Sequence, residues 1–258
     1  MKAIDLNSDV GESFGAYKLG MDEEVIKYIT SANIACGWHA GDPSVMEKTV
    51  KMAVEHGVGV GAHPGYPDLL GFGRRNMNCS TKDVKDYLVY QIGALEAFCK
   101  VHGTRLCHVK PHGALYLTAV ENQEVARAVA EAIVSVNDDL FYVALAGKKG
   151  ERMREIGQEV GLKVVYEAFP DRVYTPEGNL LSRKLPGAVI KDPEVVSKRA
   201  LKMAKEGQVI AVDGKTIPLE VQTLCVHGDT PTAVDLVKSI RTILKDNRVE
   251  VKPMIEFA

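Results

Sequence analysis

Four histidines of this chain lie in short polar segments rich in glycine and proline, each placed directly after an apolar run. They are His39, His63, His112 and His227, and the carboxylates and the lysine that accompany them are Asp9, Glu12, Lys110, Glu167 and Asp229. Imidazole, carboxylate and ammonium groups gathered in one cleft suit proton transfer at neutral pH, because their ordinary pKa values bracket it. These residue types predict an active site, provided that the fold brings the segments together.

The elements that must position these residues form an alternating pattern. Seven short β-prone runs alternate with helical stretches, which is typical of βα units and a parallel sheet. The predicted strands are Ala3 to Leu6, Ala32 to Cys36, Val58 to Ala62, Leu106 to Val109, Phe141 to Leu145, Val164 to Tyr166, and Thr223 to Val226. Ligands of such folds bind beyond the carboxyl ends of the strands, where six of these seven runs are followed by polar candidates. The fifth run ends in Ala146-Gly147.

Several helices and turns are also marked. Apolar stripes over residues 84–99 and 125–136 predict amphipathic helices. Asp42, Asp192 and Thr230 each precede a proline and predict helix N-caps, and Ser80 with Asp83 has the form of a capping box. Residues 208–221 predict a hairpin around Asp213-Gly214, whereas residues 167–191 are too long for an ordinary connection and are interpreted as a functional loop rather than an inserted element.

Each candidate has a structural alternative. His56 and His102 precede glycines at helix ends and fit a favourable interaction with the helix dipole, and His108 lies within a strand, where packing explains it. Asp9 and Glu12 could instead make a turn or start a helix. Arg74 and Arg75 either bind a substrate carboxylate or form a solvated pair, and Arg172 could do the former or pair with Asp171. Lys110 has the stronger claim, because a lysine closing an apolar strand is costly to bury without an anion.

Composition narrows the class of protein. The chain has 258 residues and a net charge of -2, so it can bury a large core and offers no electrostatic footprint for nucleic acid. No apolar stretch reaches the roughly 20 residues of a membrane span, and no signal peptide is recognisable, so we expect a cytoplasmic protein. Its five cysteines form no CxxC pair, which favours free thiols. Without linkers or repeats, residues 1–258 are expected to form one domain.

Two nucleotide-binding motifs fail on inspection. GVGVGA from Gly57 lies within a predicted strand and precedes a His-Pro turn, so it is no dinucleotide fingerprint. DGKT at residues 213–216 has Val209 where a P-loop requires its first glycine. The chain shows no recognisable ATP site.

The polar segments together resemble the LamB/YcsF family. The matching segments, in order along nearly the whole chain, are DLNSDVGESFG at 5–15, SANIACGWHAGDP at 31–43, GAHPGYPDLLGFGRR at 61–75, VKPHGALY at 109–116, EAFPDRVYTPEGNLLSR at 167–183 and CVHGD at 225–229. Trp38 and Pro170 depart from the usual phenylalanine and alanine. The resemblance implies a distorted seven-stranded (β/α) barrel, similar to the glycoside hydrolase and deacetylase architecture, and the independent count of seven strands agrees with it.

The resemblance also implies an activity, namely ATP-dependent opening of 5-oxo-L-proline to L-glutamate with partner subunits B and C, ATP being a co-substrate of the complex. The hypothesis for this chain is a general base among Asp9, His39 and His63, with Lys110 or His112 stabilising the developing negative charge. Substrate-binding candidates are Asn7, Arg74, Arg75 and Arg172. The deacetylase architecture further suggests Asp9, His39 and His63 as ligands if a divalent metal is used.

Two other classes stay open at this stage. One is a stand-alone metal-dependent deacetylase or amidohydrolase acting on a small amide or sugar, and the other is a noncatalytic binding module. A module would favour stacking aromatic residues, of which this chain has only 6%. Homo-oligomer formation is also left open.

Overall fold

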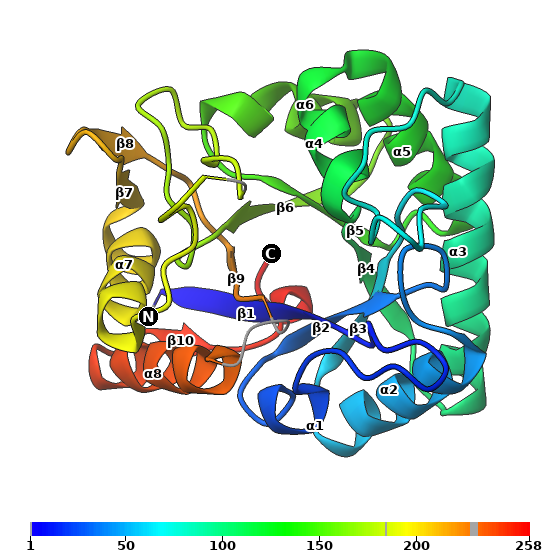
Figure 1. Ribbon diagram of the computed structural model, residues 1–258, viewed down its shortest axis with the longest axis horizontal. Helices are drawn as coiled ribbons and strands as arrows, with labels where there is room; N and C mark the ends of the chain where they lie inside the picture. Colours follow the sequence, from blue (N-terminus) through cyan, green and yellow to red (C-terminus); the bar gives the residue numbers. More distant parts are fainter. Residues whose placement is uncertain (1, 184, 228–231) are drawn as a thin grey trace.

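The structure is a computed structural model that describes residues 2–183, 185–227 and 232–258. Seven parallel strands form a closed barrel, because β1 pairs with β2 on one side and with β9 on the other (Figure 1). They are β1 (Ala3–Val10), β2 (Ser31–Ala35), β3 (Gly59–His63), β4 (Leu106–Val109), β5 (Phe141–Leu145), β6 (Lys163–Ala168) and β9 (Thr223–Cys225). The seven predicted strands and the barrel are therefore confirmed.

Helices surround the barrel (Figure 1). They are α1 (Asp22–Val25), α2 (Pro43–Glu55), α3 (Thr81–Val101), α4 (Gly113–Glu121), α5 (Gln123–Val136), α6 (Glu151–Glu159), α7 (Pro193–Glu206) and α8 (Ala233–Asp246), with short 3-10 turns η1 (Lys148–Gly150) and η2 (Met254–Glu256). The apolar stripes predicted over residues 84–99 and 125–136 lie on α3 and α5. None of the helices in the described ranges is long and apolar enough to cross a membrane.

The predicted helix starts hold wherever the structure describes them. The carboxylate of Asp42 accepts hydrogen bonds from the amides of Ser44 and Val45 at 2.8 and 3.0 Å, and Asp192 caps α7 in the same way. Ser80 and Asp83 form the capping box of α3. The expected cap at Thr230 lies outside the described residues.

Two small sheet elements lie outside the barrel. The predicted hairpin is confirmed as β7 (Gln208–Ile210) and β8 (Thr216–Pro218), which pair antiparallel. β10 (Glu250–Val251), which the sequence pattern did not predict, pairs in parallel with the start of β1. The segment after β6 stays irregular, with isolated bridges between Arg172 and Val189 and between Tyr174 and Leu180.

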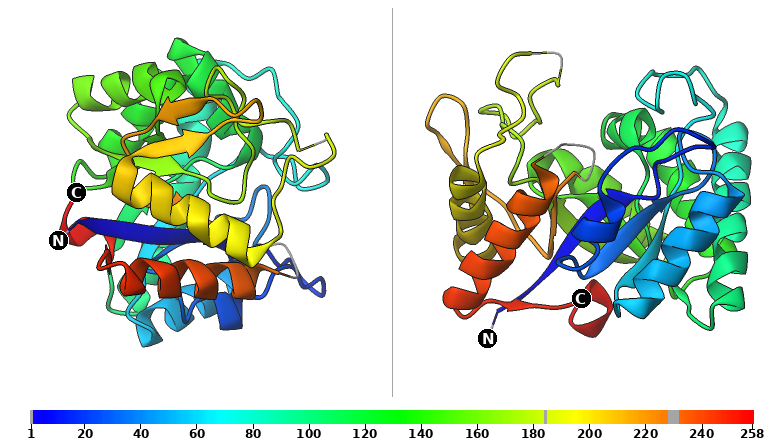
Figure 2. Two further views of the ribbon diagram at one scale, coloured as in Figure 1. Left: turned by 90° about the vertical axis from the view of Figure 1, so that its left-hand side faces the viewer. Right: turned by 60° about the horizontal axis from the view of Figure 1, so that its bottom comes forward.

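The strand β1 shows how the barrel interior is made polar. Its even positions, such as Ile4 and Leu6, join the apolar core, while the odd positions carry Asp5, Asn7 and Asp9. Asp9 contacts Lys110, which follows β4, and such a contact between non-neighbouring strands runs through the barrel interior. The loops that follow the strands gather at the end of the barrel opposite to the two chain termini (right view of Figure 2).

The other end of the barrel is closed by apolar side chains. Phe141, Val143 and Val165 from β5 and β6 form a small cluster with Met254 of η2. The polar residues of the interior therefore lie between an apolar floor and the loops at the carboxyl ends of the strands.

Candidate active site and metal centre

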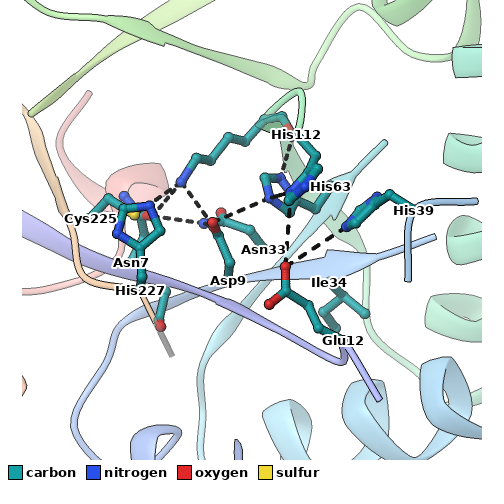
Figure 3. Close-up of polar contacts among 12 residues, drawn as sticks. Asn7, Asp9, Glu12, Asn33, Ile34, His39, His63, His112, Cys225 and His227 are labelled. Carbon is teal, nitrogen blue, oxygen red and sulfur yellow. Dashed lines mark hydrogen bonds and ion pairs between the residues drawn. The ribbon is translucent and has the colours of Figure 1, made fainter. Parts of the chain in front are cut away.

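The carboxyl ends of the strands bring the candidate residues together, as the strand-end rule predicts. Asn7 and Asp9 lie on β1, His63 ends β3, Lys110 follows β4, Glu167 lies on β6, and Cys225 ends β9. Figure 3 shows Asp9, His63, His112, Cys225 and His227 around one centre, with Glu12 and His39 beside it. The side chains of Asp9, Glu12 and His227 retain 9%, 6% and 12% exposure, so the cluster meets solvent on their side.

Lys110 is the charged centre of this cluster. Its Nζ lies 2.9 Å from Asp9 Oδ1 and 2.9 Å from Glu167 Oε1, and it donates a 3.0 Å hydrogen bond to Cys225 Sγ. Burial opposes the charge, but Asp9, Cys225 and Glu167 outweigh burial and hold the pKa of Lys110 well above its usual value. Burial also opposes ionisation of Asp9, whose pKa is nevertheless held well below its usual value by His63 and Lys110. The pair is therefore an ammonium and a carboxylate at neutral pH.

Asn33 of β2 fixes the position of Asp9 from below. Its Nδ2 donates to Asp9 Oδ1 at 2.8 Å and to Asn7 Oδ1 at 2.7 Å, while its Oδ1 lies 2.7 Å from His108 Nε2. A Cβ on Gly61 would lie 2.0 Å from that same nitrogen, so only glycine leaves room for the His108 ring. His108 is thus buried as expected, but within a polar network. Asn33 was not among the candidates from sequence, although its alternation with Ser31 along β2 is the signal that places it inside the barrel.

A second buried carboxylate lies one layer deeper. Asp5 is fully buried and accepts hydrogen bonds from Thr30 and Ser31 at 2.7 and 2.6 Å and from Thr223. Burial raises the pKa of Asp5 to about 6 in spite of these hydrogen bonds. Asn7 Nδ2 donates to Thr223 Oγ1 at 2.6 Å, which links this layer to the one above. Of this layer, only Asn7 was a candidate from sequence.

Three histidines and a glutamate form a second group beside Asp9. The candidate ligand atoms of Glu12, His39, His63 and His112 all lie within 4.8 Å of one another, and the four residues are buried, so this group could hold a metal ion. Burial and the neighbouring imidazoles lower the pKa values of His39 and His112 well below the usual value. This set differs from the expected ligands Asp9, His39 and His63: it contains Glu12 and His112, while Asp9 is engaged by Lys110.

His227 lies on the other side of Asp9 and has a carboxylate behind it. Its Nδ1 is 2.8 Å from Asp171 Oδ2, and its ring stacks on Phe169 with centroids 5.7 Å apart. Burial opposes ionisation of Asp171, but the neighbouring His227 holds its pKa below the usual value. Asp9, Cys225 and His227 form another group with metal-ligand spacing, in which the ammonium of Lys110 already supplies a cation. Asp229 lies outside the described residues.

The structure separates the three candidate arginines. Arg75 is bound to Asp68, with Nε 2.9 Å from Oδ1, and its side chain is 65% exposed. Arg74 is exposed and lies over the Phe72 ring at 4.8 Å. Arg172 is only 7% exposed; its Nη2 donates to the carbonyl of Leu181, and its Nε has no hydrogen-bond partner among the described residues. Burial and the nearby Arg183 lower the pKa of Arg172 to about 10.

A parallel barrel with buried imidazoles, carboxylates and an ammonium at its strand ends defines a (β/α)-barrel with an enzyme-like site. The chain belongs to the LamB/YcsF family, which it matches over residues 4–258. It is 56% identical over 254 residues to the A-type component of 5-oxoprolinase from Thermococcus onnurineus, covering 98% of each chain.

Solved structures agree with this assignment. The lactam utilization protein of Thermus thermophilus is 47% identical, with a TM-score of 0.91 over 97% of this chain and 99% of that one. A peptidoglycan deacetylase from Bacillus subtilis is 13% identical, with a TM-score of 0.50 over 99% of this chain and 89% of that one. The second likeness concerns the fold alone, and it places this barrel among the deacetylase-like barrels.

Proposed function

We propose that this chain opens the lactam ring of 5-oxo-L-proline to give L-glutamate, as one component of an ATP-hydrolysing complex with subunits B and C. The names of the relatives from Thermococcus onnurineus and Thermus thermophilus support the substrate class. The observation within this chain that carries the proposal is the buried ammonium of Lys110, which lies between Asp9 and Glu167 at the strand ends.

ATP is needed for a chemical reason. A five-membered lactam is a stabilised amide, so its hydrolysis near neutral pH is helped by coupling to ATP hydrolysis. Phosphorylation of the amide oxygen would make the ring carbon a good electrophile. Because this chain has no recognisable ATP motif, we assign much of the nucleotide chemistry to the partner subunits, with this chain holding the activated lactam.

The geometry suggests a role for each part of the cluster. Attack on the ring carbon places negative charge on an oxygen, and the fixed ammonium of Lys110 is suited to stabilise it. His227, oriented by Asp171 at 2.8 Å, is suited to take a proton from the attacking water and to return it to the departing ring nitrogen. This assigns the base to His227 instead of Asp9, His39 or His63, because the carboxylate of Asp9 is engaged by Lys110.

The substrate carboxylate requires a cationic partner. Arg172 fits this role better than Arg75, because Arg172 is buried and has an unpartnered Nε, whereas Arg75 is bound to Asp68 at the surface. A guanidinium binds a carboxylate with directional hydrogen bonds, so Arg172 would select 5-oxoproline over lactams that lack the acid group.

A second candidate function is supported by the group of Glu12, His39, His63 and His112. In this alternative, the chain acts alone as a metal-dependent deacetylase or amidohydrolase on a small amide or sugar, without ATP. A cytoplasmic location suits either function, since the five cysteines, all within the described residues, are free, as in a reducing compartment.

The test is reconstitution. The chain is mixed with its authentic partner subunits, 5-oxoproline and ATP, and released glutamate and ADP are measured together. Our proposal predicts glutamate only when ATP and the partners are present. Glutamate release by this chain alone, without ATP, would support the second candidate, and failure of the complete mixture to release glutamate would refute the first.

A further inference from the structure

We propose that Glu12, His39, His63 and His112 bind one divalent transition-metal ion, such as Zn²⁺, beside the Lys110 ion pair. The inference goes beyond the proposed function and rests on side-chain geometry alone. It therefore stands or falls separately from the identity of the substrate.

The first argument is the direction of the ring nitrogens. His63 Nδ1 lies 2.7 Å from the carbonyl oxygen of Lys110, and His112 Nε2 lies 2.8 Å from that of Phe72, so each nitrogen donates its hydrogen to a carbonyl. The opposite nitrogens of these neutral rings, His63 Nε2 and His112 Nδ1, then carry lone pairs only 3.0 Å apart. Two lone pairs at this distance repel one another unless a cation lies between or beside them.

The second argument is the spacing of the ligand atoms. Bonds of about 2.0–2.1 Å in a tetrahedral zinc site put the ligand atoms about 3.3 Å apart. Here the His63 and His112 nitrogens are separated by 3.0 Å, and Glu12 Oε1 lies 3.9 Å from His112 Nδ1 and 3.8 Å from His39 Nε2. Shifts of a few tenths of an ångström would bring these atoms to the distances of a metal site.

His39 supplies the third argument, because it is a buried polar side chain without an explanation in the fold. It is fully buried, and neither ring nitrogen has a hydrogen-bond partner among the described residues. Its ring stacks on His112, with centroids 3.7 Å apart and planes 4° from parallel. Parallel rings cannot both hold one ion in their planes, so His39 must turn about its Cβ–Cγ bond to become the fourth ligand. We therefore expect His39 to contribute less affinity than His112.

The backbone around His112 is shaped to hold the ring. Phe72, whose carbonyl accepts from His112, has a positive φ of 53°, an unfavourable conformation for a non-glycine residue. At Gly73, a Cβ would lie 2.7 Å from both His112 Cδ2 and His39 Cβ, so a larger residue would displace both rings. A hydrogen bond from the distal ring nitrogen to a carbonyl is the usual arrangement that orients a metal-binding histidine.

A shared proton between His63 and His112 is the competing explanation for their contact, with Asp9 Oδ2 3.3 Å from His63 Nε2 as the compensating charge. The two explanations differ in a measurable way. A proton requires no ion, whereas a metal site requires Glu12, which the competing explanation does not use.

The experiment titrates Co²⁺ and Zn²⁺ into the full-length chain after treatment with a chelator, followed by calorimetry and by the visible absorption of bound Co²⁺. We expect one ion per chain, with the absorption of cobalt coordinated by imidazole. His112→Ala and Glu12→Gln should each lower affinity by at least about 100-fold, and His39→Ala by less. His102→Ala alters a histidine near the end of α3 that lies outside the group and should bind like the parent protein.

Asp9→Asn decides between the two ligand sets. Affinity within a few-fold of the parent supports the set containing Glu12, whereas metal loss in Asp9→Asn with retention in Glu12→Gln would overturn it. Failure of the parent protein to bind either ion would overturn the metal site and favour the shared proton. Glutamate release in the reconstituted complex is measured on the same preparations, so that failure of the proposed function is recognised separately.

Discussion

Replacing Lys110 with methionine removes the only side-chain ammonium that the described structure places between Asp9 and Glu167. Methionine preserves the length of the side chain but leaves two buried carboxylates without this cation. Removing one partner of a buried ion pair typically costs about 3–5 kcal/mol, because the remaining charge stays buried and uncompensated. For a chain of this size, that loss corresponds to a decrease of roughly 10 °C in melting temperature.

The assay is urea unfolding of the parent and of Lys110→Met, with Lys198→Met as the matched control. Lys198 pairs with Glu194 at 2.6 Å, but both side chains are largely exposed, as their values of 67% and 76% show. Such a surface pair contributes about 0–1 kcal/mol. If the reasoning is right, the two lysine variants should differ by several kcal/mol although each removes one ion-paired ammonium.

A double variant tests the cause. Lys110→Met combined with Glu167→Gln removes one of the uncompensated carboxylates, so it should be more stable than Lys110→Met alone. The defect of Lys110→Met should also shrink as the pH falls, because Asp9 then takes up a proton in the folded state. The reasoning is refuted if Lys110→Met costs no more than Lys198→Met, or if the double variant loses the full sum of the two single losses.

Three further predictions follow from the interior and the arginines. Asp5 has a folded-state pKa of about 6, above its ordinary value of 3.8, so the folded protein holds this proton more tightly; raising the pH from about 4 to 7 should lower the unfolding free energy of the parent relative to Asp5→Asn by about 3 kcal/mol, measured by urea unfolding at each pH, and a pH-independent difference would contradict it. Arg172→Gln should reduce kcat/KM for 5-oxoproline by about 100-fold, with little effect on 2-pyrrolidinone, whereas Arg75→Gln should leave both nearly unchanged; equal effects of the two variants would remove Arg172 from the carboxylate site. Gly61→Ala should destabilise the fold by about 1–3 kcal/mol in thermal unfolding, since its Cβ would overlap the His108 ring, and unchanged stability would show that the ring can move away at no cost.

The strands and their polar ends could be predicted from the sequence because both are local signals. Short apolar runs and proline-preceded caps act within a few residues, and the strand-end rule then places Asp9, His63 and Lys110 at one end of the barrel without any distances. For the same reason, β10 was missed: it has two residues, Glu250–Val251, and is defined by its pairing with β1.

The partners of each charge could not be predicted, because they depend on side chains that meet across the barrel. Lys110 and Asp9 are 101 residues apart in sequence, and Asn33 reaches His108 across 75 residues. Arg75 and Asp68, by contrast, are only 7 apart, but no local rule distinguishes their pairing from a substrate contact. The choice between Asp9 and Glu12 as a candidate metal ligand likewise depends on Lys110, which competes for Asp9.

The most direct test of the account measures glutamate release by the reconstituted complex containing His63→Ala. His63 ends β3 and contacts both Asp9 and His112, so it joins the two halves of the site. We predict that turnover falls to background while circular dichroism and complex assembly match those of the parent and of His102→Ala. Turnover at the parent rate in His63→Ala, in a correctly assembled complex, would contradict the claim that this cluster opens the lactam.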